Sequence, residues 1–371
     1  MANIIVVGAG VVGTSVAYRL AQAGAKVTVI EATRVGGGTS GISFAWTNSC
    51  NKAPRSYHDL NVAGMQAHAA LKEEFGATPW WHGGGRIEWK AEADREDQRA
   101  KVGRLQDWGY AAEWIDRKQL AELEPDIDPR AVGDAPIAFY PKDGWLDPVV
   151  YAHAMMSAAR KLGAALRIQT KVTGLVVEGG KVKGVRSESG EVIGADLVVN
   201  CTGRWSNDTI GETAPNVPLA PTVGFLVFTP PVPASIQRVV ATPTCDFRPD
   251  GAGRLMLHWG PADALVNPEI TDRPGTEQAA DLVDRLTKIL PGIAPVKPEA
   301  SRVTKRPIPK DGFSAIGPVP GLDGYYVMVT HSGVTLSPAL GAIAADEIMR
   351  GVARKELADF RPERFFRPAR P

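Results

Sequence analysis

The sequence predicts an α/β fold, in which a doubly wound, mostly parallel sheet carries an inserted antiparallel β-rich part. The apolar run IIVV (4–7) leads into closely spaced glycines and a helical pattern, which is typical of a buried parallel strand and its crossover helix. Residues 171–203 instead alternate between apolar and polar side chains with glycine turns, as in an antiparallel meander. A second glycine-bearing strand-to-helix junction follows GYYVMVT (324–330).

The first elements form a βαβ unit. After the strand at 4–7, a helix has its apolar face on Val16, Ala17 and Leu20 and is closed by Gly24. The next strand is KVTVIEA (26–32), and residues 56–75 have a helical pattern.

From about residue 80 the pattern changes. WWHGGGRIEWK (80–90) predicts a strand, 91–109 a charged helix, and 135–148 a strand with turns. Residues 148–164 predict a helix, 222–262 a β-rich stretch, 275–290 a helix, and the end of the chain a long helix. We expect a discontinuous domain of 1–80, 148–220 and 305–371 and an inserted domain of 81–147 and 221–304. The motifs and the resemblance described below make the former the nucleotide-binding (FAD-binding) domain and the latter the substrate-binding domain.

The bulk composition excludes several classes of protein. The chain has 371 residues and a formal net charge of +1, which gives no electrostatic reason to expect nucleic acid or an anionic membrane surface as a partner. Its three cysteines, Cys50, Cys201 and Cys245, are too scattered for a disulfide framework or a zinc site, and we expect no metal. No apolar run reaches the roughly 20 residues of a membrane span, and no signal peptide is evident. We expect a cytoplasmic protein.

The stretch VVGAGVVG (6–13) predicts a Rossmann-like dinucleotide site. Gly8 permits the tight turn, Gly10 lets the backbone approach a pyrophosphate, and Gly13 lets the helix pack on the strand. Glu31 is placed to bind ribose hydroxyls, and its charge disfavours the 2′-phosphate of NADP. This unit alone does not separate NAD from FAD.

Two further stretches favour FAD. GGGTSGISFAWTNS (36–49) provides small and hydroxyl residues directly after the second strand, and ADLVVNCTGRWS (195–206) is a buried-type strand that ends in a glycine turn. The antiparallel middle of the chain also differs from the second run of parallel units that is usual in NAD dehydrogenases.

Together with RPIPKDGFSAIG (306–317) and THSGVTLSPALG (330–341), these motifs give the chain a family resemblance over nearly its whole length. It resembles the D-amino-acid oxidase/glycine oxidase/sarcosine oxidase family of FAD-dependent oxidoreductases, and within it the bacterial D-amino-acid-dehydrogenase-like members. Members with covalent flavin carry a cysteine near the C-terminal motif, whereas no cysteine here follows Cys245. The resemblance therefore implies non-covalent FAD.

The resemblance also implies the cofactor contacts. Glu31 and the first glycines would hold the ADP half, Thr39 and Ser40 the pyrophosphate, and residues 333–336 the flavin pyrimidine through backbone N–H groups. The expected contacts are Gly8, Gly10, Val11, Val12, Gly13, Glu31, Ala32, Thr39, Ser40, Ser43, Val172, Thr202, Gly203, Trp205, Gly333, Val334, Thr335 and Leu336.

Arg306 matches the family position that holds a substrate carboxylate, and a planar guanidinium suits that task. The alternative is a structural ion pair, for example with Asp311. The other candidate catalytic residues are His331, His258, Asn48 and Trp46. For each of these an ordinary role remains open: His331 could cap the turn, and the others could simply pack. Tyr57 and Arg86 are further pocket candidates.

The resemblance implies oxidation of the C–N bond of a D-amino acid, imino acid or N-substituted glycine by hydride transfer to flavin, giving an imine and then a keto acid or aldehyde. GRLMLHWG (253–260) lacks the lysine that assists reaction with oxygen in sarcosine-oxidase-like members, which favours a dehydrogenase over an oxidase. The electron acceptor could be oxygen, a quinone or an electron-transfer protein. Homo- and hetero-oligomers, and a peripheral location at the inner membrane, stay open.

Two alternative functions remain. One is the flavoprotein subunit of a heteromeric opine- or hydroxyproline-type dehydrogenase, and the other is a non-catalytic flavin-binding regulatory protein.

Overall fold

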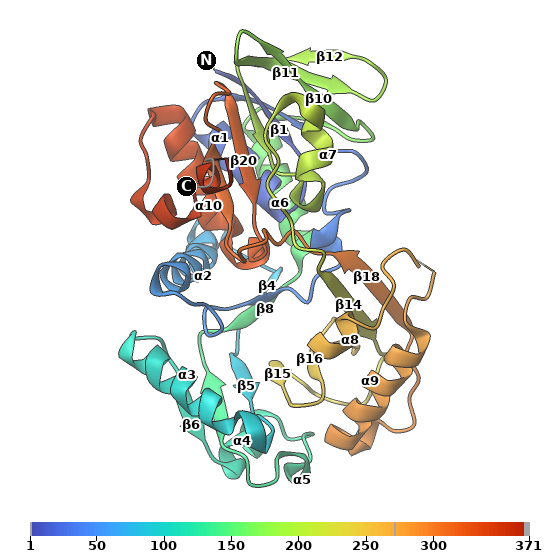
Figure 1. Cartoon of the computed structure of the whole chain (residues 1–371). Coiled ribbons are helices and arrows are strands. Elements are labelled where there is room, and N and C mark those ends of the chain that lie inside the picture. The colour runs from blue at the N-terminus through green and yellow to red at the C-terminus, as the bar shows by residue number, and fades with distance from the viewer. Residues whose placement is uncertain (1, 271, 367–371) are drawn as a thin grey trace, which may run out of the picture.

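The computed structural model describes residues 2–270 and 272–366. Its upper half in Figure 1 is built on a six-stranded sheet. The strands, in order across the sheet, are β19 (Ala315–Pro318), β20 (Tyr325–Val329), β13 (Leu197–Asn200), β1 (Asn3–Val7), β2 (Lys26–Ile30) and β9 (Ala165–Arg167). All neighbours are parallel except β19 and β20.

Strand β1 is apolar from Ile4 to Val7 because both faces of this sheet are covered. Ile4 and Val6 belong to the core under the helices, whereas Ile5 and Val7 belong to a second core on the opposite face. The side-chain alternation of a strand explains this division. The helices are α1 (Val11–Gln22), α2 (Arg55–Phe75), α6 (Pro148–Lys161) and α10 (Gly333–Arg350). The opposite face carries the antiparallel strands β10 (Val172–Glu178), β11 (Lys181–Ser187) and β12 (Val192–Gly194).

The lower half in Figure 1 is an eight-stranded sheet with helices around it. Its strands in order are β18 (Ala300–Lys305), β14 (Val223–Phe228), β17 (Leu255–His258), β16 (Asp246–Pro249), β15 (Val239–Ala241), β5 (Arg86–Glu88), β7 (Ile137–Tyr140) and β6 (Glu113–Ile115). The accompanying helices are α3 (Arg95–Asp107), α4 (Arg117–Leu123), α5 (Pro129–Val132), α8 (Gly260–Asp263) and α9 (Thr276–Ile289).

Between the two halves lies a small sheet of β3 (Trp46–Thr47), β8 (Gly144–Leu146) and β4 (Trp81–His82). It combines segments on both sides of the domain boundaries that the sequence suggests, and those boundaries stay a prediction.

The α/β fold class and the helices expected at 56–75, 148–164 and 275–290 are confirmed by α2, α6 and α9. The single strand expected at 80–90 is wrong, because Gly84 (φ 102°) and Gly85 (φ 94°) break it into β4 and β5. Over residues 2–270 and 272–366, no helix is both long and apolar enough to cross a membrane.

Candidate active site

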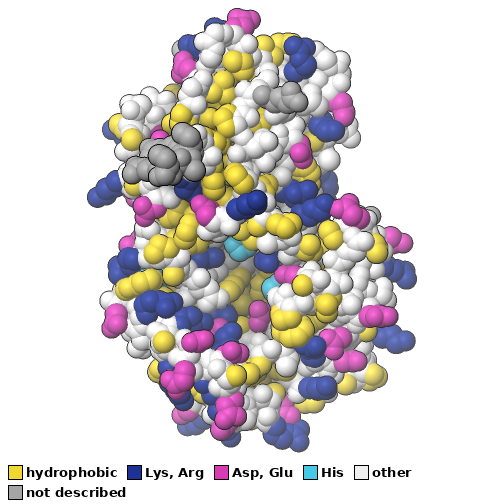
Figure 2. All heavy atoms as spheres, in the orientation of Figure 1, with side chains coloured by type: hydrophobic (Ala, Val, Ile, Leu, Met, Phe, Trp, Pro, Cys, Tyr) yellow, Lys and Arg dark blue, Asp and Glu magenta, His cyan; other side chains and the backbone are white. Residues whose placement is uncertain are grey.

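A large cavity of about 1070 Å³ begins at the carboxyl ends of β1, β2, β13 and β20 and continues to β14, β16 and β17. Ordinary small-molecule pockets measure roughly 300–1,000 Å³, so this one has room for a large ligand. In doubly wound sheets, ligands bind at this end of the strands. Figure 2 shows the hollow between the two halves, with histidine and charged side chains inside it.

The first glycine turn is possible only with glycine. A Cβ on Gly8 would lie 2.7 Å from the Cys201 carbonyl oxygen, and one on Gly13 would lie 1.9 Å from the Gly8 carbonyl oxygen. A Cβ on Gly10 would lie 2.9 Å from Ser40 Oγ. Because α1 starts at Val11, its positive N-terminal end faces the cavity lining.

Glu31 is held rigidly where β2 ends. Its Oε2 accepts a hydrogen bond from the Ala9 backbone N–H (2.8 Å), and its Oε1 accepts from the backbone N–H (2.8 Å) and the hydroxyl (3.0 Å) of Thr33. A carboxylate has about four acceptor sites, so acceptor capacity remains for ligand hydroxyls. Glu31 lines the cavity.

The second junction, between β20 and α10, meets the first one. A Cβ on Gly333 would lie 3.3 Å from Val12 Cγ2, so the starts of α10 and α1 are adjacent. A Cβ on Gly64 of α2 would lie 2.4 Å from the Thr335 carbonyl oxygen. Burial lowers the pKa of His68 to about 4, and its Nε2 lies 2.8 Å from the Val334 carbonyl oxygen. The neutral ring therefore donates to this carbonyl and fixes the start of α10.

Arg306 also lines the cavity and pairs with Asp263. Arg306 Nη2 is 3.2 Å from Asp263 Oδ2, which is also 3.2 Å from His258 Nε2. Asp263 Oδ1 accepts from the Phe225 backbone N–H (2.8 Å), so β14 fixes the carboxylate. The alternative partner Asp311 is wrong, because Asp311 pairs with Arg364 (2.7 Å).

His258 carries a positive charge at neutral pH. Burial alone would lower its pKa, but hydrogen bonds and charge interactions with Asp246 and Asp263 outweigh burial and raise the pKa to about 9. The pKa of His331 is shifted in the opposite direction. His331 is exposed to the cavity, yet desolvation, followed by repulsion from Lys52, Arg306 and His258, lowers its pKa to about 3. His331 is therefore a neutral ring among cations.

Trp46 and Asn48 also line the cavity. Trp46 Nε1 donates to Asp143 Oδ2 (3.1 Å), and the Arg86 guanidinium lies 4.1 Å from the centre of the Trp46 ring. Asn48 Oδ1 is buried and has no hydrogen-bond partner among the described residues. Tyr57 lines the cavity, and its hydroxyl lies 2.7 Å from Ser332 Oγ.

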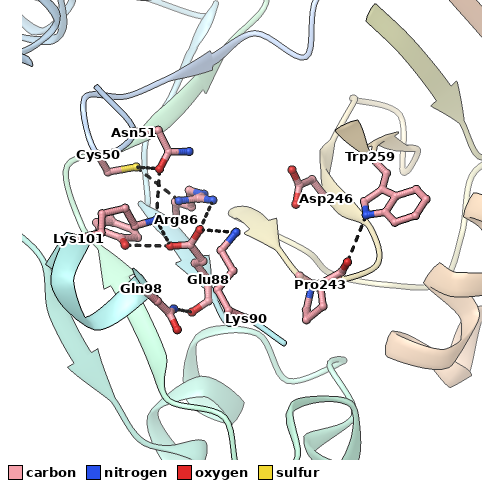
Figure 3. Close-up of polar contacts among 12 residues, drawn as sticks. Cys50, Asn51, Arg86, Glu88, Lys90, Gln98, Lys101, Pro243, Asp246 and Trp259 are labelled. Carbon is pink, nitrogen blue, oxygen red and sulfur yellow. Dashed lines mark hydrogen bonds and ion pairs between the residues drawn. The ribbon is translucent and has the colours of Figure 1, made fainter. Parts of the chain in front are cut away.

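Arg86 belongs to a buried charge cluster behind Trp46 and does not line the cavity (Figure 3). Glu88 is fully buried and binds Arg86 (2.9 Å), Lys90 (3.2 Å) and Lys101 (2.5 Å). Burial would raise the pKa of Glu88, but these three cations outweigh burial and hold the pKa well below its usual range.

The structure brings most of the predicted site residues to one cavity. The expected cofactor contacts line it except for Gly13 and Leu336, and all five candidate catalytic residues line it. Gly13 packs against the backbone of Gly8, where α1 contacts the turn that follows β1. Leu336 is fully buried in the core. Sequence reasoning missed Lys52, Asp246 and Asp263, because no motif marks them.

Residues 3–347 match the DAO family, described as FAD dependent oxidoreductase. The chain belongs to this family. A glycine oxidase of Bacillus licheniformis is 28% identical over 98% of this chain and 97% of that protein. Hydrogen cyanide synthase subunit HcnC of Pseudomonas aeruginosa is 24% identical over 98% of this chain and 96% of that protein. The fold matches the crystal structure of L-proline dehydrogenase from P. horikoshii, with a TM-score of 0.84 and 22% identity over 98% of each chain.

The protein is therefore an FAD-dependent oxidoreductase of the class that acts on amino acids or amines. The residues present fit FAD: a Cβ at Gly8 or Gly13 would meet backbone atoms, Glu31 can meet ribose hydroxyls, and two helix N-termini face one cavity.

Proposed function

We propose that the protein binds an amino acid or N-substituted glycine by its carboxylate at Arg306 and oxidises the neighbouring C–N bond. The observation that carries this proposal is the Arg306–Asp263 pair inside the cavity. Asp263 binds Nη2 of the guanidinium, while the Arg306 side chain is 30% exposed and its other guanidinium nitrogens make no hydrogen bond to a described residue. A carboxylate can satisfy such donors through two parallel hydrogen bonds.

The residues of the chain orient the substrate and control its proton. Bound FAD, non-covalent in this proposal, supplies the chemistry by accepting a hydride from the carbon that carries nitrogen. Arg306 fixes the orientation of that carbon, which is a major part of the catalytic task. The neutral His331 ring can accept a hydrogen bond from the substrate amine. The N-terminus of α10 at Gly333 carries partly positive backbone N–H groups. These groups would stabilise the negative charge of a bound flavin when it is reduced. Water then converts the imine product to a keto acid or aldehyde.

A heteromeric dehydrogenase is the second candidate, favoured by the likeness to HcnC, which is by name a subunit of hydrogen cyanide synthase. In that case electrons would leave through a partner protein rather than to oxygen. Within this proposal the protein is cytoplasmic, with a peripheral inner-membrane contact where a quinone is the acceptor.

The test is anaerobic reduction of the purified, FAD-loaded protein by a panel of D-amino acids, imino acids and N-methylglycine. At least one substrate should bleach the flavin absorbance, and Arg306→Met should raise the apparent Kd for that substrate at least tenfold while Asp311→Asn leaves it within twofold. Repeating the panel in air separates an oxidase from a dehydrogenase. Absence of bleaching by every compound, with candidate electron-accepting partners added, would contradict the proposal and favour the regulatory alternative.

A further inference from the structure

Arg248 is a buried arginine that connects the eight-stranded sheet to the wall of the cavity. It lies on β16 and is only 1% exposed. Its Nε donates to the Phe44 carbonyl oxygen (2.6 Å). Its Cζ lies 5.6 Å from the centre of the Phe44 ring and 4.5 Å from the centre of the Trp145 ring. Because burying a charge is unfavourable unless its donors are used, these contacts hold Phe44 to β16.

The segment of residues 42–45, which contains Phe44, is held from both sides. Ala45 has a φ of 53°, in the left-handed region that a residue with a Cβ keeps only where its surroundings fix it. The Ala45 carbonyl oxygen accepts from the Leu146 backbone N–H of β8 (3.0 Å), and Arg248 holds the carbonyl oxygen before it. All four residues of this segment line the cavity, whereas Arg248 does not. Arg248 therefore fixes a part of the cavity wall to which it does not itself belong.

Strand β14 places the Phe44 ring beside Arg306. Gly224, Leu226 and Phe228 point to one face of β14, because side chains alternate along a strand. A Cβ on Gly224 would lie 3.4 Å from Arg306 Cγ and Cδ, so the Arg306 side chain lies over Gly224. Phe44 packs on the apolar cluster that contains Leu226 and Phe228. An apolar wall therefore follows Arg306 along the same face of this strand.

His258 gives a second, independent link between Phe44 and Arg306. The centre of its ring is 5.7 Å from the centre of the Phe44 ring. Its Nε2 lies 3.2 Å from Asp263 Oδ2, the atom that also binds Arg306. Both links place the Phe44 ring next to the proposed carboxylate site.

We propose that Arg248 is a positioning residue for the substrate: by holding the segment 42–45, it keeps the Phe44 ring as an apolar wall beside Arg306, and this wall contacts the part of the ligand beyond its carboxylate. This inference rests on the function proposed above. A ligand bound both at Arg306 and against the wall would be held in one orientation. The apolar area that the ligand buries against the Phe44 ring would add to its affinity.

Two carboxylates that carry no amine test the wall without turnover. The FAD-loaded protein is titrated with acetate and with 3-methylbutanoate, following flavin absorbance and heat of binding. The two anions share the carboxylate, and 3-methylbutanoate adds an isopropyl group. The selectivity ratio is the Kd for acetate divided by the Kd for 3-methylbutanoate. Burial of the isopropyl group against the wall should give the wild type a ratio of roughly ten or more.

Matched variants assign that ratio to Arg248 and Phe44. Arg248→Met removes the donors and should lower the ratio at least fivefold, while the Kd for acetate stays within twofold. Phe44→Ala removes the ring and should have the same effect. Because Arg248 acts through Phe44, the double variant should have the same ratio as Phe44→Ala alone. Arg238→Met is the control, since Arg238 also donates to a backbone carbonyl oxygen, that of Leu123 (2.6 Å), and does not line the cavity.

A milder variant covers the case in which Arg248→Met does not fold. Arg248→Lys keeps the charge but not the planar set of donors, and it should lower the selectivity ratio less than Arg248→Met does. A cooperative thermal transition and an unchanged flavin spectrum show that a variant is folded. If Arg248→Met does not fold, Arg248→Lys decides the question, and a wild-type ratio for this variant would overturn the proposal.

The outcomes separate this inference from the proposed function. The positioning role would be overturned by equal effects of Arg248→Met on the two acids, by a wild-type ratio near one, or by single-variant effects that add in the double variant. If amines still bleach the flavin in that case, the proposed function stands. If instead no amine bleaches the flavin while the ratio depends on Arg248, the apolar wall stands and the proposed oxidation fails.

Discussion

Replacing Asp263 by Asn should change how the stability of the protein depends on pH. The carboxylate binds His258, Arg306 and the backbone of Phe225. Asn keeps the shape but removes the charge. Asp246 and Asp263 together raise the pKa of His258 from 6.5 to about 9. Loss of the Asp263 charge should therefore lower the pKa of His258 toward its usual value.

The magnitude follows from that pKa. A rise from 6.5 to about 9, at about 1.4 kcal/mol per pH unit, corresponds to roughly 3 kcal/mol of native-state stability. His258 is only 21% exposed, so water screens it little. Because the folded-state pKa is the higher one, this contribution is fully present below about pH 6.5 and is lost as the pH rises through about 9. Losing one of two partners should remove about half of it, roughly 1.5 kcal/mol.

The assay is urea unfolding of the FAD-loaded wild type and variant at intervals from pH 6 to pH 10, at constant excess FAD. The difference in unfolding free energy should be larger at pH 6 than at pH 10 by roughly 1.5 kcal/mol. Asp311→Asn is the control, because Asp311 pairs with an arginine rather than a histidine, so its penalty should be constant. A pH-independent penalty for Asp263→Asn would refute the assignment of a cationic His258.

Three further predictions concern the fold and the cofactor. Glu88→Gln should lower the unfolding free energy by about 3–5 kcal/mol, because Arg86 and Lys101 lose their buried carboxylate; the exposed Glu191→Gln should cost less than about 1 kcal/mol, and similar urea midpoints for the two would contradict this. Gly64→Ala should destabilise by about 1–3 kcal/mol, since its Cβ would lie 2.4 Å from the Thr335 carbonyl oxygen, whereas Gly103→Ala meets nothing within 4 Å and should be neutral or stabilising in thermal melts. Glu31→Gln should weaken FAD binding roughly tenfold, about 1.4 kcal/mol, in fluorescence titrations of the apoprotein, and an unchanged Kd would exclude Glu31 as a ribose ligand.

Elements whose signal is local were predictable from the sequence. The apolar β1 and the glycines after it mark a buried strand and a tight turn, because only glycine fits where a Cβ would meet backbone atoms. The break between β4 and β5 was not predicted, since the apolar and aromatic residues on both sides of Gly84 conceal a positive-φ turn.

The polar network of the site was only partly predictable. Arg306 and His258 were found, but their shared partner Asp263 lies on the four-residue helix α8, where no periodicity or motif singles it out. Asp311 follows Arg306 closely in sequence, yet in the folded protein it forms an ion pair with Arg364. Lys52 was missed because no motif marks it and because Arg306 and Asp143, two of the charges that act on it, lie far away along the chain.

Because the two glycine junctions contact each other, they constrain the order in which the parts of the cavity can assemble during synthesis. Strand β1 is made before β13 and β20, yet it pairs with β13, and β13 pairs with β20. The α1 and α10 N-termini come together only after Gly333 has been made. Such long-range contacts form late and slowly. A nascent chain that stops before α10 therefore has the glycine turn without the part of the cavity lining that residues 333–335 supply.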